Sequence, residues 1–119
     1  MNKTEYLDML SDTVVDKVKV DKVQSVFGRE VSETVQKIVS CSEDTVFFDD
    51  GYRTLSINEI INADEQLHAQ FTENGLVPLI DCGDNDFIVY NAKDNNWSKY
   101  NIVDDVVFKI RETFEELFI

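Results

Sequence analysis

The 119-residue sequence predicts a single α+β domain in which an antiparallel sheet packs against helices from both ends of the chain. Apolar residues recur with helical spacing before residue 41 and after residue 111, whereas short apolar runs separated by turn residues fill the middle. A hydrophobic content of 43% supports a packed core, and a chain of this length buries most of its apolar surface without disulfides or metals. This order of elements favours a sandwich with the sheet on one side and the helices on the other.

The first 40 residues are predicted to be mainly helical. The first helix covers residues 4–10, with three apolar side chains on one face: Tyr6, Leu7 and Leu10. The spacing over residues 21–27 is also helical, and Gly28 is a typical helix stop. Residues 13–20 fit either a helix or a strand, because their valines match both periods. A further helix is expected after Ser32, whose hydroxyl can accept a free backbone N–H as an N-cap.

The next part of the chain changes to a mixed pattern. Thr45–Phe48 is predicted to form a short strand, which ends at the turn tripeptide Asp49–Gly51. Ser56 and Glu59 match the capping box, in which a hydroxyl and a carboxylate three residues later satisfy each other's free backbone donors. We therefore expect a helix that runs from residue 57 toward Phe71, with a possible break along the way.

The last third of the chain predicts strands followed by a helix. Val77–Asp81 is a predicted strand, and Phe87–Tyr90 is apolar on both faces, which is typical of a strand covered on both sides. The polar turn Asn91–Asn96 joins the second strand to Trp97–Ile102, whose alternation indicates a half-exposed strand, so that the two form a hairpin. Arg111–Phe118 places three apolar residues on one stripe and predicts a C-terminal amphipathic helix.

The net charge of −13 is unevenly distributed. Residues 38–92 contain eleven acidic side chains and a single base, Arg53. A field of this sign repels nucleic acid and anionic membranes, and it accelerates encounter with a basic protein. The alternative is that the acidity only keeps the chain soluble.

Cysteine content and hydropathy bear on the cellular location. Cys41 and Cys82 are too few and too far apart for a disulfide framework or a zinc site, which favours the reducing cytoplasm. The N-terminus has no apolar signal segment, and no apolar run is long enough to span a bilayer. We therefore expect a cytoplasmic protein that binds no nucleic acid, membrane or cofactor.

Three segments resemble the SUKH superfamily: Val20–Ile38, Gly75–Tyr90 and Thr113–Phe118. They are similar to its opening helix pair, its central strand pair with an apolar-Pro-apolar first strand, and its terminal Ser-Phe-x-x-Phe-Leu helix. The resemblance covers the chain from about Val20 to Ile119. Val31-Ser32 stands where Leu-Pro is usual in the family, so the chain resembles a divergent member. The resemblance implies a non-enzymatic domain, since many bacterial members are immunity proteins that neutralise a nuclease or deaminase toxin domain.

The residues themselves offer little sign of catalysis or metal binding. His68 is the only histidine, and it lies in a predicted helix among polar residues. No base flanks either cysteine, so both are interpreted as small core residues. The acidic cluster Asp81, Asp84 and Asp86 lacks the glycine position and the distal Glu of a calcium loop, so no metal site is predicted.

Three functional hypotheses follow, in decreasing order of support. The first is an immunity or inhibitor protein whose acidic face blocks a basic toxin, with eight candidate contact residues: Asp49, Asp50, Tyr52, Asp81, Asp84, Asp86, Asp94 and Trp97. Each acid has the alternative role of a turn residue, and Trp97 that of a core residue. The second hypothesis is a regulatory or scaffold protein with a resident cellular partner. The third is an enzyme that uses an unrecognised pair of carboxylates.

Overall fold

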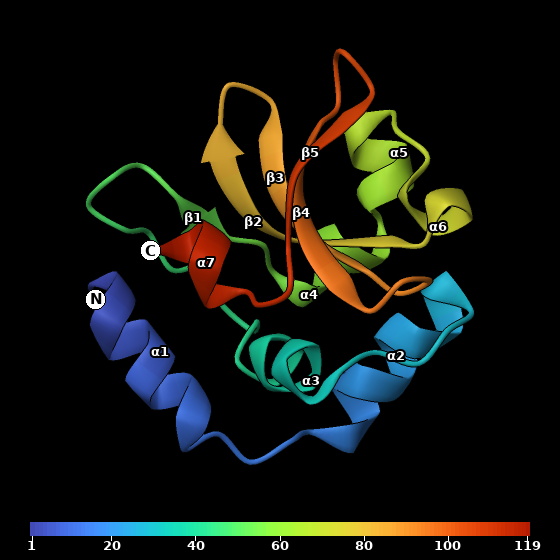
Figure 1. Ribbon diagram of the computed structural model, residues 1–119. Helices are drawn as coiled ribbons and strands as arrows, with labels where there is room; N and C mark the ends of the chain where they lie inside the picture. Colours follow the sequence, from blue (N-terminus) through green and yellow to red (C-terminus); the bar gives the residue numbers. More distant parts are fainter.

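The computed structural model describes all residues from Met1 to Ile119 and contains one five-stranded antiparallel sheet in the order β1-β2-β3-β4-β5 (Figure 1). The strands are β1 (Arg53–Thr54), β2 (Leu76–Gly83), β3 (Asp86–Asn91), β4 (Asn96–Asn101) and β5 (Val106–Arg111). The helices are α1 (Lys3–Ser11), α2 (Lys17–Phe27), α3 (Glu33–Ser40), α4 (Ile57–Ile61), α5 (Ala63–Leu67), α6 (Phe71–Asn74) and α7 (Glu115–Phe118). The predicted α+β class with an antiparallel sheet is confirmed.

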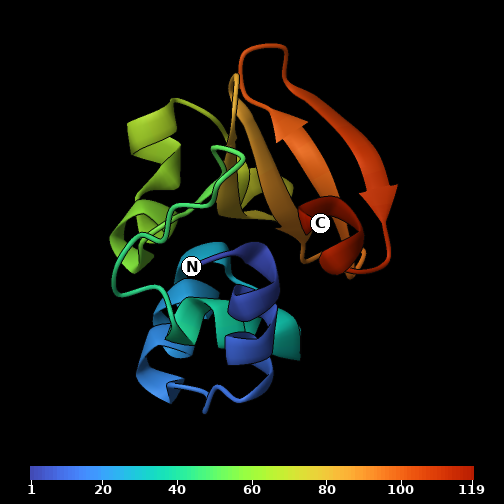
Figure 2. The same ribbon diagram turned by 90° about the vertical axis from the view of Figure 1, so that its left-hand side faces the viewer.

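Helices cover both faces of the sheet, which corrects the expected one-sided sandwich. The ring of Phe71 in α6 lies 5.5 Å from Tyr100, and the ring of Phe114 beside α7 lies 5.1 Å from Trp97. Trp97 and Tyr100 are three residues apart in β4 and therefore point to opposite faces. Figure 2 shows α4 and α5 on one side of the sheet, α7 on the other, and α1–α3 below its lower end.

The N-terminal helices begin and end largely where the sequence predicts. The ambiguous residues 13–20 divide at Asp16, whose carboxylate accepts the N–H groups of Val18 and Lys19 and starts α2. Gly28 ends α2 in the left-handed conformation, with φ of 66°. Ser32 occupies the N-cap position of α3, but its buried hydroxyl has no hydrogen-bond partner, so the predicted side-chain cap is wrong.

The strand predicted at Thr45–Phe48 is wrong. Only one isolated bridge forms there, between Phe47 and Arg53, the chain turns back at Asp49–Gly51, and the side chain of Phe48 is buried in the core. The Ser56 capping box is confirmed. The helix that it starts is broken into α4, α5 and α6, with His68 ending α5 in a left-handed conformation.

Strand β5 was not predicted, and it shortens the expected C-terminal helix. Arg111 belongs to β5, so only Glu115–Phe118 is helical. The sequence did not predict β5 because this edge strand has apolar side chains on both exposed faces and no alternating pattern. A register shift in its pairing with β4, together with a positive φ at Lys109, indicates a bulge, which blunts this free edge against pairing with other chains.

A chain of aromatic contacts joins the two ends of the polypeptide to the sheet. The ring of Tyr6 in α1 contacts Phe48 and Phe118, and Phe118 stacks on Phe114 at 4.8 Å between ring centroids. Phe114 in turn packs on Trp97. Phe118 is fully buried, and α1, the 42–52 loop and Phe114 beside α7 share this side chain as a packing partner.

We expect Phe118→Ala to destabilise the fold by about 3–5 kcal/mol, because it removes the ring that α1, the 42–52 loop and α7 share. Urea unfolding followed by circular dichroism would measure the change. The neighbouring variant Ile119→Ala is the control, since Ile119 is 71% exposed and its loss should change stability by less than about 0.5 kcal/mol. Equal effects of the two variants would contradict the role assigned to this aromatic chain.

Candidate partner-binding surface

The eight residues predicted from the sequence do not assemble into one face. Asp84 and Asp86 lie at the turn between β2 and β3, whereas Asp94 lies in the turn between β3 and β4, at the opposite end of the sheet. The other five belong to three further places: Asp49, Asp50 and Tyr52 in the loop before β1, Asp81 in β2, and Trp97 in the core. The expected single acidic face is therefore corrected to separate regions.

Two turns at one end of the sheet are held side by side. The backbone N–H of Ile102 donates to the carbonyl of Asn85 at 3.0 Å, and the side-chain amide of Asn101 donates to the carboxylate of Asp86 at 2.8 Å. Both turns project from the upper end of the sheet in Figure 1. We call the four carboxylates on them the acidic sheet end: Asp84, Asp86, Asp104 and Asp105. None of the four forms an ion pair within the chain.

Two of the four carboxylates were missed by the sequence analysis. Asp104 and Asp105 lie between β4 and β5. Because β5 was not predicted, there was no reason to place a turn at these two residues. A sequence signal for them exists in the repetition of the pattern Tyr-Asn-x-x-Asp-Asn/Asp at residues 90–95 and 100–105. The first copy had been assigned to a hairpin turn, and the second copy predicts another.

The two copies of this pattern form equivalent turns. The side-chain oxygen of Asn91 accepts the N–H groups of the residues two and three positions later, and that of Asn101 does the same. The hydroxyl of Tyr90 donates to the side chain of Asn95 at 2.7 Å, and that of Tyr100 donates to Asp105 at 2.6 Å. The sixth residue of each copy has a φ just above 50°, which Asn and Asp tolerate better than most residues.

The predicted contacts near β1 are engaged within the chain. The ammonium group of Lys3 pairs with Asp50 and lies 3.8 Å from the ring centroid of Tyr52. Lys99 donates to the Tyr52 hydroxyl at 2.9 Å. Tyr52 is therefore held between two cations, and the charge of Asp50 is compensated, whereas Asp49 is exposed without an ion pair.

Arg53, the single base of the acidic segment, is committed to an internal network. Its guanidinium group lies 3.0 Å from a carboxylate oxygen of Glu59 and 3.3 Å from one of Asp81. Burial disfavours the ionised form of Glu59, but hydrogen bonds from Arg53 and from the backbone N–H of Ser56 outweigh it and lower the pKa of Glu59. Asp81 therefore acts as part of this network that ties β2 to the start of α4.

Two further predicted residues are placed by packing and turn geometry. Trp97 is 4% exposed, with its ring 5.2 Å from that of Tyr90, so the core role that the sequence left open for it is the observed one. Its indole is not presented as a surface anchor. The carboxylate of Asp94 accepts from the side-chain amide of Asn91 within the turn at the other sheet end.

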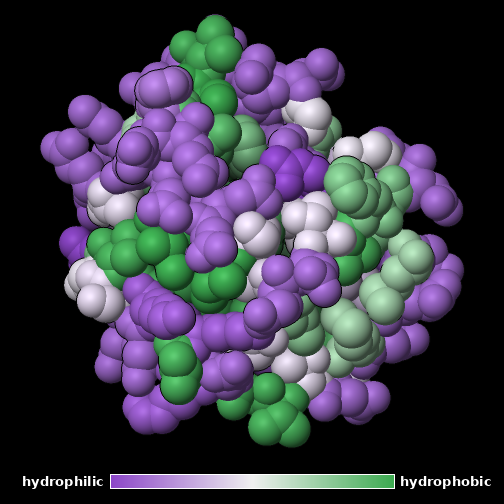
Figure 3. Space-filling model, turned by 180° about the vertical axis from the view of Figure 1, so that it is seen from behind, coloured by the Kyte–Doolittle hydropathy of each residue, from purple (hydrophilic) through white to green (hydrophobic).

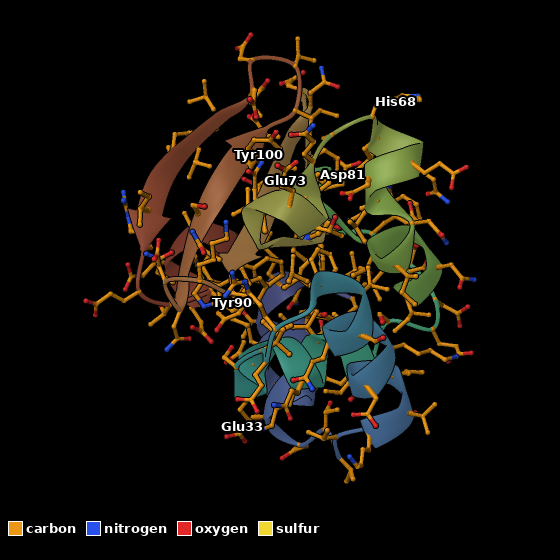
Figure 4. All side chains as sticks on the ribbon, turned by 90° about the vertical axis from the view of Figure 1, so that its right-hand side faces the viewer. Glu33, His68, Glu73, Asp81, Tyr90 and Tyr100 are labelled. Carbon is orange, nitrogen blue, oxygen red and sulfur yellow. The ribbon has the colours of Figure 1, made fainter.

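The potentially reactive side chains lie apart from one another. His68 is exposed at the outer end of α5, across from Tyr100 on the sheet (Figure 4). Burial raises the pKa of the Cys82 thiol to about 11, so that it is protonated at neutral pH. Cys41 lies 3.0 Å from the hydroxyl of Thr13, and both cysteines are free. No group of three or more His, Cys, Asp and Glu side chains is arranged to hold a metal ion.

The largest hollow is an open apolar groove of about 690 Å³ between α2 and α4. Val18, Val26 and Ile61 supply its apolar surface. Seen from behind, the molecule is mostly hydrophilic, and its hydrophobic residues form separate patches (Figure 3). The other residues that line this groove are Asp21, Lys22 and Ser25.

No protein-family model, curated protein or solved structure matches this chain. The resemblance to SUKH proteins therefore depends on the sequence segments alone. No helix combines the length and the apolar character that crossing a membrane requires.

We expect Glu59→Gln to lower the free energy of unfolding by about 1 kcal/mol at pH 7, because it removes the charged partner of Arg53. Since the pKa of Glu59 is lowered in the folded protein, this contribution is full above the ordinary value of 4.5 and is lost as the pH falls through the folded-state value.

Chemical unfolding of both proteins from pH 7 to pH 3 would test this dependence, with an expected convergence of the two stabilities at the acidic end. The control Glu65→Gln removes an exposed carboxylate that forms no ion pair, and it should stay within about 0.5 kcal/mol of the parent at every pH. A constant difference between parent and Glu59→Gln across this range would contradict the assigned interaction.

Proposed function

We propose that this protein is a non-catalytic binding domain that captures a basic protein partner at the acidic sheet end. The observation that carries the proposal is the set of four carboxylates on two adjoining turns, none of them in an ion pair with a cation of the chain. The resemblance to SUKH immunity proteins adds the class of partner, a toxin domain with nuclease or deaminase activity.

The rigidity of the two turns supports this role. Hydrogen bonds from Asn101 and Ile102 hold the two turns together, and the hydroxyl of Tyr100 closes the β4–β5 turn by donating to Asp105. The carboxylates of Asp86 and Asp105 are fixed by these bonds before binding and lose little conformational freedom when a partner arrives, so more of their electrostatic attraction appears as affinity. A flexible acidic tail of the same charge would lack this advantage.

The sign of the charge supports a basic partner. A surface that handles nucleic acid carries Lys and Arg side chains that neutralise phosphates. Carboxylates at the acidic sheet end can occupy the same positions as those phosphates and so compete for the same cations. A toxin that acts on nucleic acid therefore has the complementary surface, whereas nucleic acid itself and anionic membranes are repelled by the net charge of −13.

The non-catalytic part of the proposal is supported by the separation of the reactive groups. The only histidine lies at the end of α5, and the raised pKa of Cys82 keeps that thiol from acting as a nucleophile at neutral pH. The network of Arg53, Glu59 and Asp81 has a structural task at the start of α4.

The test is affinity capture of the tagged protein from a lysate of its source strain, followed by binding measurements with the purified partner. We expect a basic toxin domain whose binding weakens between about 50 mM and about 200 mM salt. The variant with Asp84→Asn, Asp86→Asn and Asp104→Asn should bind it about tenfold more weakly, at about 0.5 kcal/mol per charge. Asn tolerates the positive φ of residue 84, so the turn is retained.

The control is a variant with the same change of charge elsewhere: Asp8→Asn, Asp12→Asn and Glu65→Gln, three exposed acids without ion pairs. It should bind as the parent does and should protect cells that express the toxin. Equal binding by all three proteins would refute the acidic sheet end as the binding surface. Capture of a resident regulatory protein in place of a toxin would favour the regulatory or scaffold hypothesis.

A further inference from the structure

A small polar cavity opens beside the acidic sheet end and shares one residue with it. Its volume is about 340 Å³, which is about half that of the open groove between α2 and α4. It lies between the connection from α5 to α6 and strand β4, and six residues line it: His68, Ala69, Gln70, Tyr100, Ile102 and Asp105. No Lys or Arg is among them, and Asp105 is the only acidic residue of the lining.

The Asp105 carboxylate is held in place by Tyr100. The Tyr100 hydroxyl donates to Oδ1 of Asp105, and the tyrosine itself is 3% exposed. Burial, together with the adjacent carboxylate, raises the pKa of Tyr100 to about 12, so the hydroxyl remains a donor at neutral pH. The second carboxylate oxygen, Oδ2, accepts no hydrogen bond from the chain. The cavity therefore presents an oriented carboxylate with one oxygen still available.

The charge of Asp105 is not needed for the turn in which it lies. In the equivalent turn at the other end of β4, Asn95 has the same backbone conformation and accepts the same hydrogen bond from a tyrosine. A neutral amide is therefore sufficient for this geometry. The cavity lies beside the turn that ends at Asp105. The carboxylate of Asp105 occupies the position that the neutral side chain of Asn95 occupies in the equivalent turn.

The lining favours a guanidinium group over other cations. The side chains of Ala69 and Ile102 offer apolar surface for the aliphatic stem of an arginine, and the amide of Gln70 offers a further acceptor. A carboxylate with a free oxygen suits the forked N–H donors of arginine. A lysine ammonium group is more strongly hydrated and gains less from contact with an apolar surface.

We propose that this cavity receives an arginine side chain of the basic partner and serves as the specific anchor within the acidic sheet end. The inference rests on the proposed function and assigns the side chain that the surface recognises. The three outer carboxylates, on Asp84, Asp86 and Asp104, then supply attraction without selecting a particular side chain.

Titration with Nα-acetyl-arginine amide, followed by amide NMR spectra of the protein, would test the cavity without a purified partner. We expect saturable shifts at Gln70, Ile102 and Asp105, with a dissociation constant in the millimolar range. The matched ligand is Nα-acetyl-citrulline amide, which has nearly the same shape but no charge, and it should leave these signals in place. Asp105→Asn should weaken arginine binding at least about tenfold, while the pattern of Asn95 predicts that its turn is preserved.

Asp104→Asn is the matched control, because it removes the same charge one residue away on an exposed carboxylate that does not line the cavity. It should retain most of the arginine binding. Equal shifts with the citrulline ligand, or equal weakening by Asp104→Asn and Asp105→Asn, would overturn the anchor. The proposed function would still stand in that case if the triple variant, which keeps Asp105, lost the purified partner, so that the two failures are distinguishable.

Discussion

The central strand β3 is buried on both faces, and the remaining architecture depends on covering it. Phe87–Tyr90 are four consecutive buried residues, so each face of the strand must meet an apolar layer. Phe71 of α6 supplies one layer, and the aromatic side chains around α7 supply the other. This requirement explains why a helix of a single turn at the C-terminus is well packed. Its stability comes from burial of Phe114 and Phe118, since so short a helix has little intrinsic stability.

The acidic residues divide into carboxylates with structural tasks and carboxylates that remain free. Asp16 caps α2, Glu59 completes a capping box and pairs with Arg53, and Asp50 pairs with Lys3. The turn residues at the acidic sheet end have no such cation. A count of charge along the chain cannot separate these groups, because the separation depends on which acids the fold brings near the few bases. The attraction available to a partner is therefore local, even though the net charge is large.

The two equivalent turns at the ends of β4 show how one local structure can serve two tasks. Both use an asparagine that accepts two backbone N–H groups and a tyrosine that closes the turn. Only the copy ending at Asp105 adjoins a cavity and a second acidic turn. The difference arises from the neighbouring elements, in agreement with the general rule that function resides in sites added to a fold and not in the fold itself.

The sequence by itself determined the elements whose signals are local: the stop of α2 at Gly28, the capping box at Ser56, the doubly buried strand β3 and the hairpin that follows it. Such signals depend on backbone conformation and on the periodicity of burial within a few residues. Only the tertiary structure decided that residues 45–48 contribute a single isolated bridge, that residues 106–111 join the edge of the sheet, and that the turn with Asp104 and Asp105 lies beside the turn with Asp84 and Asp86. Contacts between residues distant in the chain decide which strands pair at the sheet edge, which acids meet a base, and which turns lie side by side. No local pattern encodes those contacts.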